Sequence, residues 1–199
     1  MAETNWTISE CEGRSHWLAK AYVPQDLRDQ LAKTDILLIP QDGFRDFTGP
    51  LYPVGTEEFL RSLQDSGGDR VTVDVTVSDD DYKELALHAD WLILAGIAAS
   101  MFAAPITVNM VSEYLKRKIW PEDPKRGVKV KLRLQDGEGE AARSVEISYE
   151  GPADDFDRSM ESAFAELRGQ GHNVPTLDEA TKLLEAPPRS DDDAEGGDG

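Results

Sequence analysis

Few residues in this sequence suit catalysis or metal binding. Its 199 residues include one cysteine, Cys11, which excludes an intramolecular disulfide and fits a reducing compartment. The three histidines (His16, His88 and His172) lack the spacing of metal ligands, and no phosphate-loop glycine pattern is present. Because no nucleophile, base and orienting group stand out together, the sequence leans away from an enzyme and predicts neither metal nor cofactor.

Positive charge is scarce as well. The chain has 39 acidic and 21 basic residues, which gives a net charge of -18, and such a surface repels nucleic-acid phosphates. We therefore expect no general nucleic-acid binding, while salt adaptation and DNA mimicry stay open as reasons for the acidity. Residues 1–5 are polar and acidic with no apolar core behind them, so we expect no signal peptide and a cytoplasmic location.

Charge is absent altogether from residues 91–112. The length suits a membrane span, but the many small residues give little apolar area to lipid. Helical spacing of apolar residues begins before the run, at Tyr82, Leu85, Ala89, Leu92, Ile93 and Gly96. We therefore expect a long, buried, small-residue-rich helix that Pro105 kinks, or that is followed by a second helix near Ala104. The alternative is a membrane-engaging component that inserts residues 91–111.

The clearest other patterns predict an α+β fold. A buried strand at 36–39, a helix at 57–64 capped by Thr56 and an alternating strand at 71–77 suggest one β-α-β unit with a right-handed crossover. Alternating strands at 128–134 and 144–150 predict a C-terminal β-hairpin. An amphipathic helix follows, with an apolar face of Phe156, Met160, Ala163, Phe164 and Leu167.

Less regular segments complete this organisation. Residues 5–23 suggest a hairpin that turns at residues 12–14, residues 24–34 a short helix, and residues 176–184 a last helix opened by a capping box. From Pro187 the chain cannot bury a core and is expected to be disordered. We expect three segments: an α/β lobe at 1–78, a helix, hairpin and helix on the same core at 79–168, and a short helix with an acidic tail at 169–199.

Basic residues concentrate between residues 114 and 135, where eight basic side chains accompany two acids. Lys129, Lys131 and Arg133 alternate with apolar residues, so we expect them to pair with the acidic face of the next strand. The remaining five lie at a helix C-terminus, where cations are favourable, or in a proline-containing loop. These five are the candidate docking residues for an acidic partner: Lys116, Arg117, Lys118, Lys125 and Arg126.

The loop at residues 41–56 is a second candidate site, for a small ligand or a reaction. It leaves the carboxyl end of the buried strand 36–39, which is a favoured ligand position in α/β units, and the start of the next helix suits an anion. The candidate ligand residues are Asp42, Arg45, Asp46, Tyr52 and Thr56. The alternative is an ordered surface loop whose aromatic residues pack onto the core.

Five segments within residues 91–168 carry a family resemblance: LILAGIAASMFAAP, YLKRK, VKVKLRL, SVEISYEG and FDRSMESAFAEL. Together they resemble the effector-associated constant component modules of bacterial conflict systems. Pro105 and the bulky Met101 and Phe102 depart from that pattern, and residues 1–78 lie outside it. The resemblance implies a non-catalytic module encoded beside an enzyme effector. We therefore expect a protein-binding adaptor or accessory component of a bacterial, defence-related assembly, with an effector protein as its partner.

Overall fold

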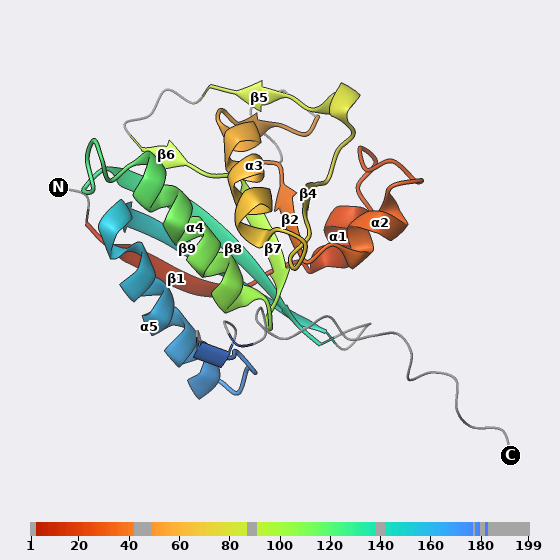
Figure 1. Ribbon diagram of the computed structural model, residues 1–199. Helices are drawn as coiled ribbons and strands as arrows, with labels where there is room; N and C mark the ends of the chain where they lie inside the picture. The colour runs from red at the N-terminus through yellow and green to blue at the C-terminus, as the bar shows by residue number, and fades with distance from the viewer. Residues whose placement is uncertain are drawn as a thin grey trace, which may run out of the picture.

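One mixed sheet organises the chain (Figure 1). The computed structural model describes residues 3–41, 49–86, 91–137, 142–176, 178, 179 and 182. The seven-stranded sheet has the order β1-β9-β8-β7-β2-β4, and β6 also pairs with β8. Its strands are β1 (Asn5–Glu10), β2 (Ile36–Ile39), β4 (Val73–Val75), β6 (Leu92–Ile93), β7 (Gly96–Ser100), β8 (Gly127–Asp136) and β9 (Arg143–Pro152). A separate parallel pair is formed by β3 (Tyr52–Pro53) and β5 (Glu84–Leu85).

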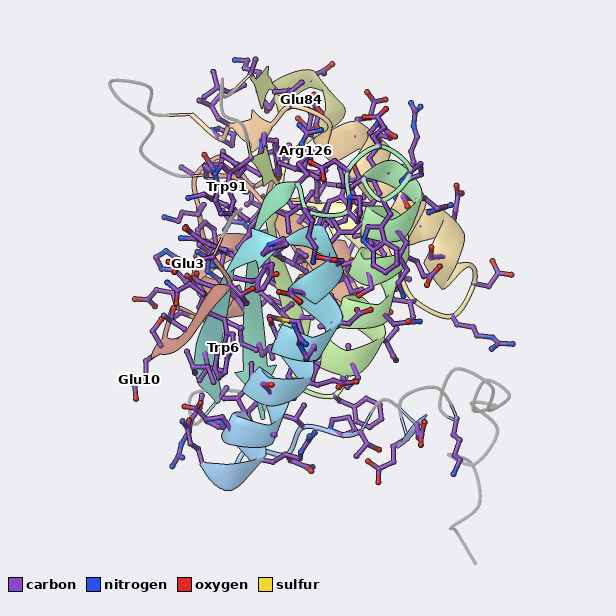
Figure 2. All side chains as sticks on the ribbon, turned by 90° about the vertical axis from the view of Figure 1, so that its left-hand side faces the viewer. Glu3, Trp6, Glu10, Glu84, Trp91 and Arg126 are labelled. Atoms are coloured by element: carbon purple, nitrogen blue, oxygen red, sulfur yellow. The ribbon has the colours of Figure 1, made fainter. Side chains whose placement is uncertain are left out.

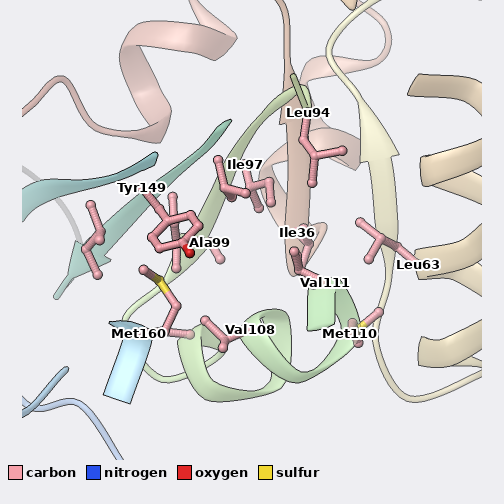
Figure 3. Packing of buried hydrophobic residues seen from close by; sticks show 14 of the residues in the cluster. Ile36, Leu63, Leu94, Ile97, Ala99, Val108, Met110, Val111, Tyr149 and Met160 are labelled. Atoms are coloured by element: carbon pink, nitrogen blue, oxygen red, sulfur yellow. The ribbon is translucent and has the colours of Figure 1, made fainter. Parts of the chain in front are cut away.

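Helices cover the two faces of this sheet unequally. The helices are α1 (Arg14–Leu18), α2 (Arg28–Lys33), α3 (Thr56–Gly67), α4 (Ala104–Lys118) and α5 (Phe156–Gly169). The main core joins one face of the sheet, here called the inner face, to α3, α4 and α5. Figure 3 shows part of it, with Val108 and Val111 of α4 beside Ile36, Ile97 and Ala99 of the sheet. A smaller cluster from α1 and α2 covers only β2 and β7 on the opposite, outer face.

The predicted β-α-β unit is present. β2 and β4 are parallel neighbours, and α3 lies between them in the chain. All four residues of β2 are buried, because Ile36 and Leu38 face the main core while Leu37 and Ile39 face the smaller one. A continuous apolar run is the sequence that a strand covered on both faces requires.

The charge-free run is not one long helix, as the sequence suggested. Its first half forms β6 and β7, and its second half forms α4, which begins at Ala104 with a proline in the first turn. Upstream, residues 79–81 form a 3-10 turn and Leu85 lies in β5, so the helical spacing from Tyr82 to Gly96 was misleading. Because β7 lies between β2 and β8 with both faces covered, its GIAAS sequence lacks the polar alternation that marks an exposed strand.

The start of α4 at Ala104 confirms the alternative in which Pro105 opens a second helix, since proline suits a first turn. Leu92, expected on a helix face, lies in β6 and is only partly buried. Within the described part of the chain, no helix combines the length and apolar character needed to cross a membrane.

The N-terminal segment also differs from the predicted hairpin. β1 pairs antiparallel with β9, over 130 residues away, and the turn at residues 12–14 leads into α1 instead of returning as a strand. Trp17 is buried in α1 against the outer face of β2 and β7. Because β1 finds its partner at the far end of the chain, the local pattern could not reveal the pairing.

The predictions for the C-terminal part of the chain are confirmed for the residues that the structure describes. β8 and β9 form the expected antiparallel hairpin, and all five residues on the predicted apolar face of α5 are buried. The capping box is present, since the Thr176 N–H and hydroxyl both donate to Glu179 at 2.8 and 2.9 Å. The expected tail from Pro187 lies outside the described residues.

Candidate functional site

The predicted ligand loop contains a structural tyrosine. Tyr52 is fully buried, and its hydroxyl donates to the Leu38 carbonyl at 3.2 Å and accepts the Thr76 N–H at 3.2 Å. Burial raises the pKa of the Tyr52 phenol to about 12. This side chain therefore ties the loop to β2 and is not open to a ligand. Asp42, Arg45 and Asp46 lie outside the described residues.

The anion position at the start of α3 is filled by the protein itself. Glu84 of β5 accepts the N–H of Gly55 at 3.0 Å and of Glu57 at 2.9 Å. Burial pulls the pKa of this carboxyl up, but the hydrogen bonds outweigh it and hold the pKa below its usual value. Thr56 is not the predicted cap, because Gly55 caps the helix and the Thr56 hydroxyl donates to Pro53 O at 2.6 Å. A ligand anion would have to displace Glu84.

The five basic candidates do not form one patch. Lys116 faces α5, with Glu113 at 3.3 Å and Asp157 at 3.4 Å, whereas Lys118 faces α3 and pairs with Glu58 at 2.7 Å. On this second side of α4, Arg117 donates to the Ser62 hydroxyl.

The two loop residues lie after α4. Lys125 pairs with Asp154 at 2.7 Å. Arg126 is exposed and has no ion pair among the described residues. Three of the five predicted docking cations (Lys116, Lys118 and Lys125) are thus already paired with acids of their own chain.

The other basic cluster lies on the outer face of the sheet, as predicted. Lys129 pairs with Glu150 at 2.9 Å, and Arg133 and Lys131 pair with Glu146 at 2.7 and 3.6 Å. The register explains these pairs, since Lys129 lies opposite Glu150 and Arg133 opposite Glu146. No described helix covers this half of the outer face, which continues across β9 into β1 as Asn5, Thr7 and Ser9. We call this area, on β8, β9 and β1, the outer ladder.

Two tryptophans border the outer ladder and hold its cations. The Arg133 guanidinium stacks on Trp17 at 4.9 Å, and the Lys129 ammonium lies over Trp91 at 5.3 Å. Gly96 leaves room for the first contact, because a Cβ there would lie 2.9 Å from an Arg133 nitrogen. Trp17, Lys129 and Arg133 line an open cavity of about 540 Å³. Its other walls include Pro40, Gln41, Leu94, Ser148 and Glu150. No sequence signal marks this cavity, since its walls come from segments far apart in the chain.

The outer edge of the sheet at β1 has free backbone groups. The Cys11 N–H donates to Ser144 O at 3.0 Å. Every second residue of β1 before Cys11 therefore also directs its backbone N–H and C=O groups toward β9. Antiparallel ladders alternate between bonded and non-bonded pairs. Trp6, Ile8 and Glu10 therefore direct their N–H and C=O groups away from β9, and these groups have no partner among the described residues. Figure 2 shows the side of the molecule on which Trp6 and Glu10 lie.

Titratable groups give no sign of an activated nucleophile in the part of the chain that the structure describes. Cys11 is half-buried, and burial raises the pKa of its thiol to about 11, which keeps it protonated and unreactive. His172 lies 3.0 Å from Asp136 in a partly buried pair at the end of β8. The described residues hold no group of three or more His, Cys, Asp and Glu side chains placed to bind a metal ion.

Comparison with known proteins adds no relative. No protein-family model, curated protein or solved structure matches this chain. The resemblance of residues 91–168 to effector-associated modules therefore stays a prediction. The outer ladder and the adjoining edge strand are the features that bear on function.

Proposed function

We propose that this protein is a non-catalytic, protein-binding adaptor that holds an effector protein on the β1 side of its sheet. One observation carries the proposal: no helix in the described part of the chain covers the outer ladder, whereas the inner face of the same strands is covered by α4 and α5. A surface of this kind, flanked by a cavity and by a free edge, offers contact area without further rearrangement.

Electrostatics favours this surface over the rest of the molecule. The outer ladder carries three cations and two acids, in a chain with a net charge of -18. Its cations and acids neutralise one another within the ladder, so a polar partner surface meets little repulsion there. Complementary polar contacts mainly set specificity and association rate. The cavity beside Trp17 and Arg133 would accept a side chain of the partner.

The structure changes which basic residues support the proposal. Lys116, Lys118 and Lys125 each pair with an acid of the chain itself, so an acidic partner would compete with those pairs. The outer ladder is also internally paired, but its pairs lie flat on a broad strand surface instead of on two opposite sides of one helix. We therefore place the effector contact on the ladder and not on the α4 cations.

The test is a single bulky substitution on the outer ladder. Thr7→Arg would project over the ladder, and the acids that flank the facing Ser148 favour its charge, so folding should persist. The matched control is Ser162→Arg, which adds the same side chain at an exposed position of α5.

Partners are captured from a lysate of the native host and quantified. We expect the Thr7→Arg protein to lose the partners that the wild-type protein captures, while the Ser162→Arg protein keeps them. Circular dichroism and thermal unfolding establish that both variants are folded. Equal capture by folded Thr7→Arg and by the wild type would refute the ladder as the contact surface.

A further inference from the structure

The edge strand β1 is paired on one side only among the described residues. It is six residues long, and its outward backbone groups at Trp6, Ile8 and Glu10 have no partner among the described residues. Natural edge strands are usually short, or carry proline, lysine or a bulge that prevents pairing. β1 has none of the residues that block an edge in this way, since its sequence is NWTISE. The opposite edge, β4, has three residues and side chains bonded to its backbone.

The side chains of β1 specify what an added strand would carry. Trp6 and Ile8 lie partly buried on the inner face and pack against the main core. Apolar residues of a partner strand beside them would continue this layer. Asn5, Thr7 and Ser9 are exposed on the outer face, so the alternate residues of the partner would be polar. The expected partner segment therefore alternates between apolar and polar residues.

Charge determines which kind of segment fits. Residues 3–13 contain three acids, Glu3, Glu10 and Glu12, and no lysine or arginine. Glu3 precedes the strand and Glu10 ends it, so negative charge flanks both ends of the free edge. A second copy of β1 would bring the same acids and another net charge of -18. Lysine or arginine near the ends of the partner segment would complement this edge.

We propose that β1 binds an extended segment of another protein by strand addition, with basic residues near the ends of that segment and apolar residues at alternate positions between them. The added strand is antiparallel and exchanges hydrogen bonds with Trp6, Ile8 and Glu10. This inference rests on the proposed adaptor function and names how the partner is held. Main-chain hydrogen bonds supply affinity in this mode, and the alternating side chains supply specificity.

The probe is a synthetic peptide, acetyl-KTVTVTK-amide, with the charge-reversed peptide acetyl-ETVTVTE-amide as its control. Binding is measured by NMR titration of the ¹⁵N-labelled full chain and by amide hydrogen exchange. Saturation with the basic peptide should slow the exchange of the Trp6, Ile8 and Glu10 amides. The Thr7 and Ser9 amides already bond to β9 and should change little. The acidic peptide should bind at least ten-fold more weakly.

Three variants test the contributions of edge pairing and of charge attraction. Glu10→Pro removes an outward N–H without touching the ladder to β9, because proline is tolerated at the free side of an edge strand. It should weaken peptide binding by about ten-fold or more, since it removes a main-chain hydrogen bond and the charge of Glu10. Glu10→Lys keeps the N–H and reverses the charge, so it carries the test if the proline variant does not fold. Glu12→Lys, outside the strand, is the matched charge control and should have the smaller effect.

Each outcome decides the inference. Protection of the three outward amides in the wild type, with weaker peptide binding in the Glu10 variants than in Glu12→Lys, would support strand addition. Absence of binding at millimolar peptide, or binding that leaves those amides unprotected, would overturn it. Protection without peptide, together with a dimer in sedimentation, would overturn the choice of a foreign strand and assign the edge to a second copy. None of these results depends on capture by Thr7→Arg, so the adaptor proposal and the edge proposal can fail separately.

Discussion

The two edges of the sheet differ in whether side chains bond to their outward backbone groups. At β4, Gln64 of α3 donates to Val73 O at 3.0 Å, and the Asp74 carboxylate accepts the Val75 N–H at 2.8 Å. At β1, the outward groups of Trp6, Ile8 and Glu10 have no such side-chain partner among the described residues. A strand edge that is satisfied by its own chain resists pairing, and one that is not satisfied invites it.

The two faces of the sheet repeat this difference. Around β2 and β7 both faces are buried, the inner under α3 and α4 and the outer under α1 and α2. Around β8, β9 and β1 the described helices cover only the inner face, and the outer ladder is polar and ion-paired. The closed side therefore provides stability, and the open side is the proposed contact surface.

The largest difference is expected from truncation of an aromatic residue on each side. Phe59 of α3 is fully buried on the closed side, so Phe59→Ala should lower the free energy of unfolding by about 3–5 kcal/mol. Trp6 is only partly buried on β1, so Trp6→Ala should cost roughly 1–2 kcal/mol, because less apolar area is lost. Chemical denaturation of both variants measures the contrast. Equal costs would show that β1 is as well enclosed as α3.

The pH dependence of stability on the closed side should depend on Glu84, whose carboxylate accepts N–H groups at the start of α3. Because its folded pKa is below its usual value, its contribution is fully present above the unfolded pKa, near 4.5, and is lost as the pH falls through the folded pKa. Glu84→Gln should therefore cost about 1 kcal/mol at neutral pH, in the range of a helix cap. The difference from wild type should disappear in acid. A difference that does not shrink as the pH falls below 4.5 would contradict the carboxylate as its source.

Removal of one side-chain hydrogen bond to the backbone of β4 should make this edge more like the β1 edge. Gln64→Ala leaves the Val73 carbonyl to water, so we expect a loss of roughly 0.5–1 kcal/mol, the net value of one partly exposed hydrogen bond. Arg61→Ala on the exposed side of the same helix is the control for a change in helix propensity. If both variants have the same stability, the hydrogen bond from Gln64 to the β4 backbone does not stabilise the edge.

The smallest effect is expected at the cations of α4. Lys118 and Glu58 form an exposed pair at 2.7 Å, and exposed pairs contribute about 0–1 kcal/mol. Lys118→Glu should therefore change stability by less than about 1 kcal/mol and should leave capture of the effector intact. Loss of capture in the folded variant would return the contact surface to α4.

Elements with a strong local period could be predicted from the sequence. β2, α3, the β8–β9 hairpin and α5 follow patterns that local geometry imposes, and the pairing of Arg133 with Glu146 follows from the hairpin register. β7 was mistaken for helix, because a strand buried on both faces has no alternation to distinguish it. β1 was assigned to a hairpin, because its pairing with β9 depends on a contact across most of the chain.

The site was less accessible to sequence reasoning for the same physical reason. Nothing near Thr56 indicates that Glu84 fills the helix N-terminus, since β5 brings it there through pairing with β3. The contact of Trp17 with Arg133 likewise joins α1 to β8. Only the free edge left a local signal, in the alternating NWTISE sequence that lacks proline and lysine.

Amide hydrogen exchange of the free protein tests the central claim that the sheet is open at β1. We predict an alternating pattern along the strand, with slow exchange at Thr7 and Ser9, which bond to β9, and fast exchange at Trp6, Ile8 and Glu10. Uniformly slow exchange from residue 5 to residue 10 would contradict the claim, because it would show that the edge is already occupied in the free protein.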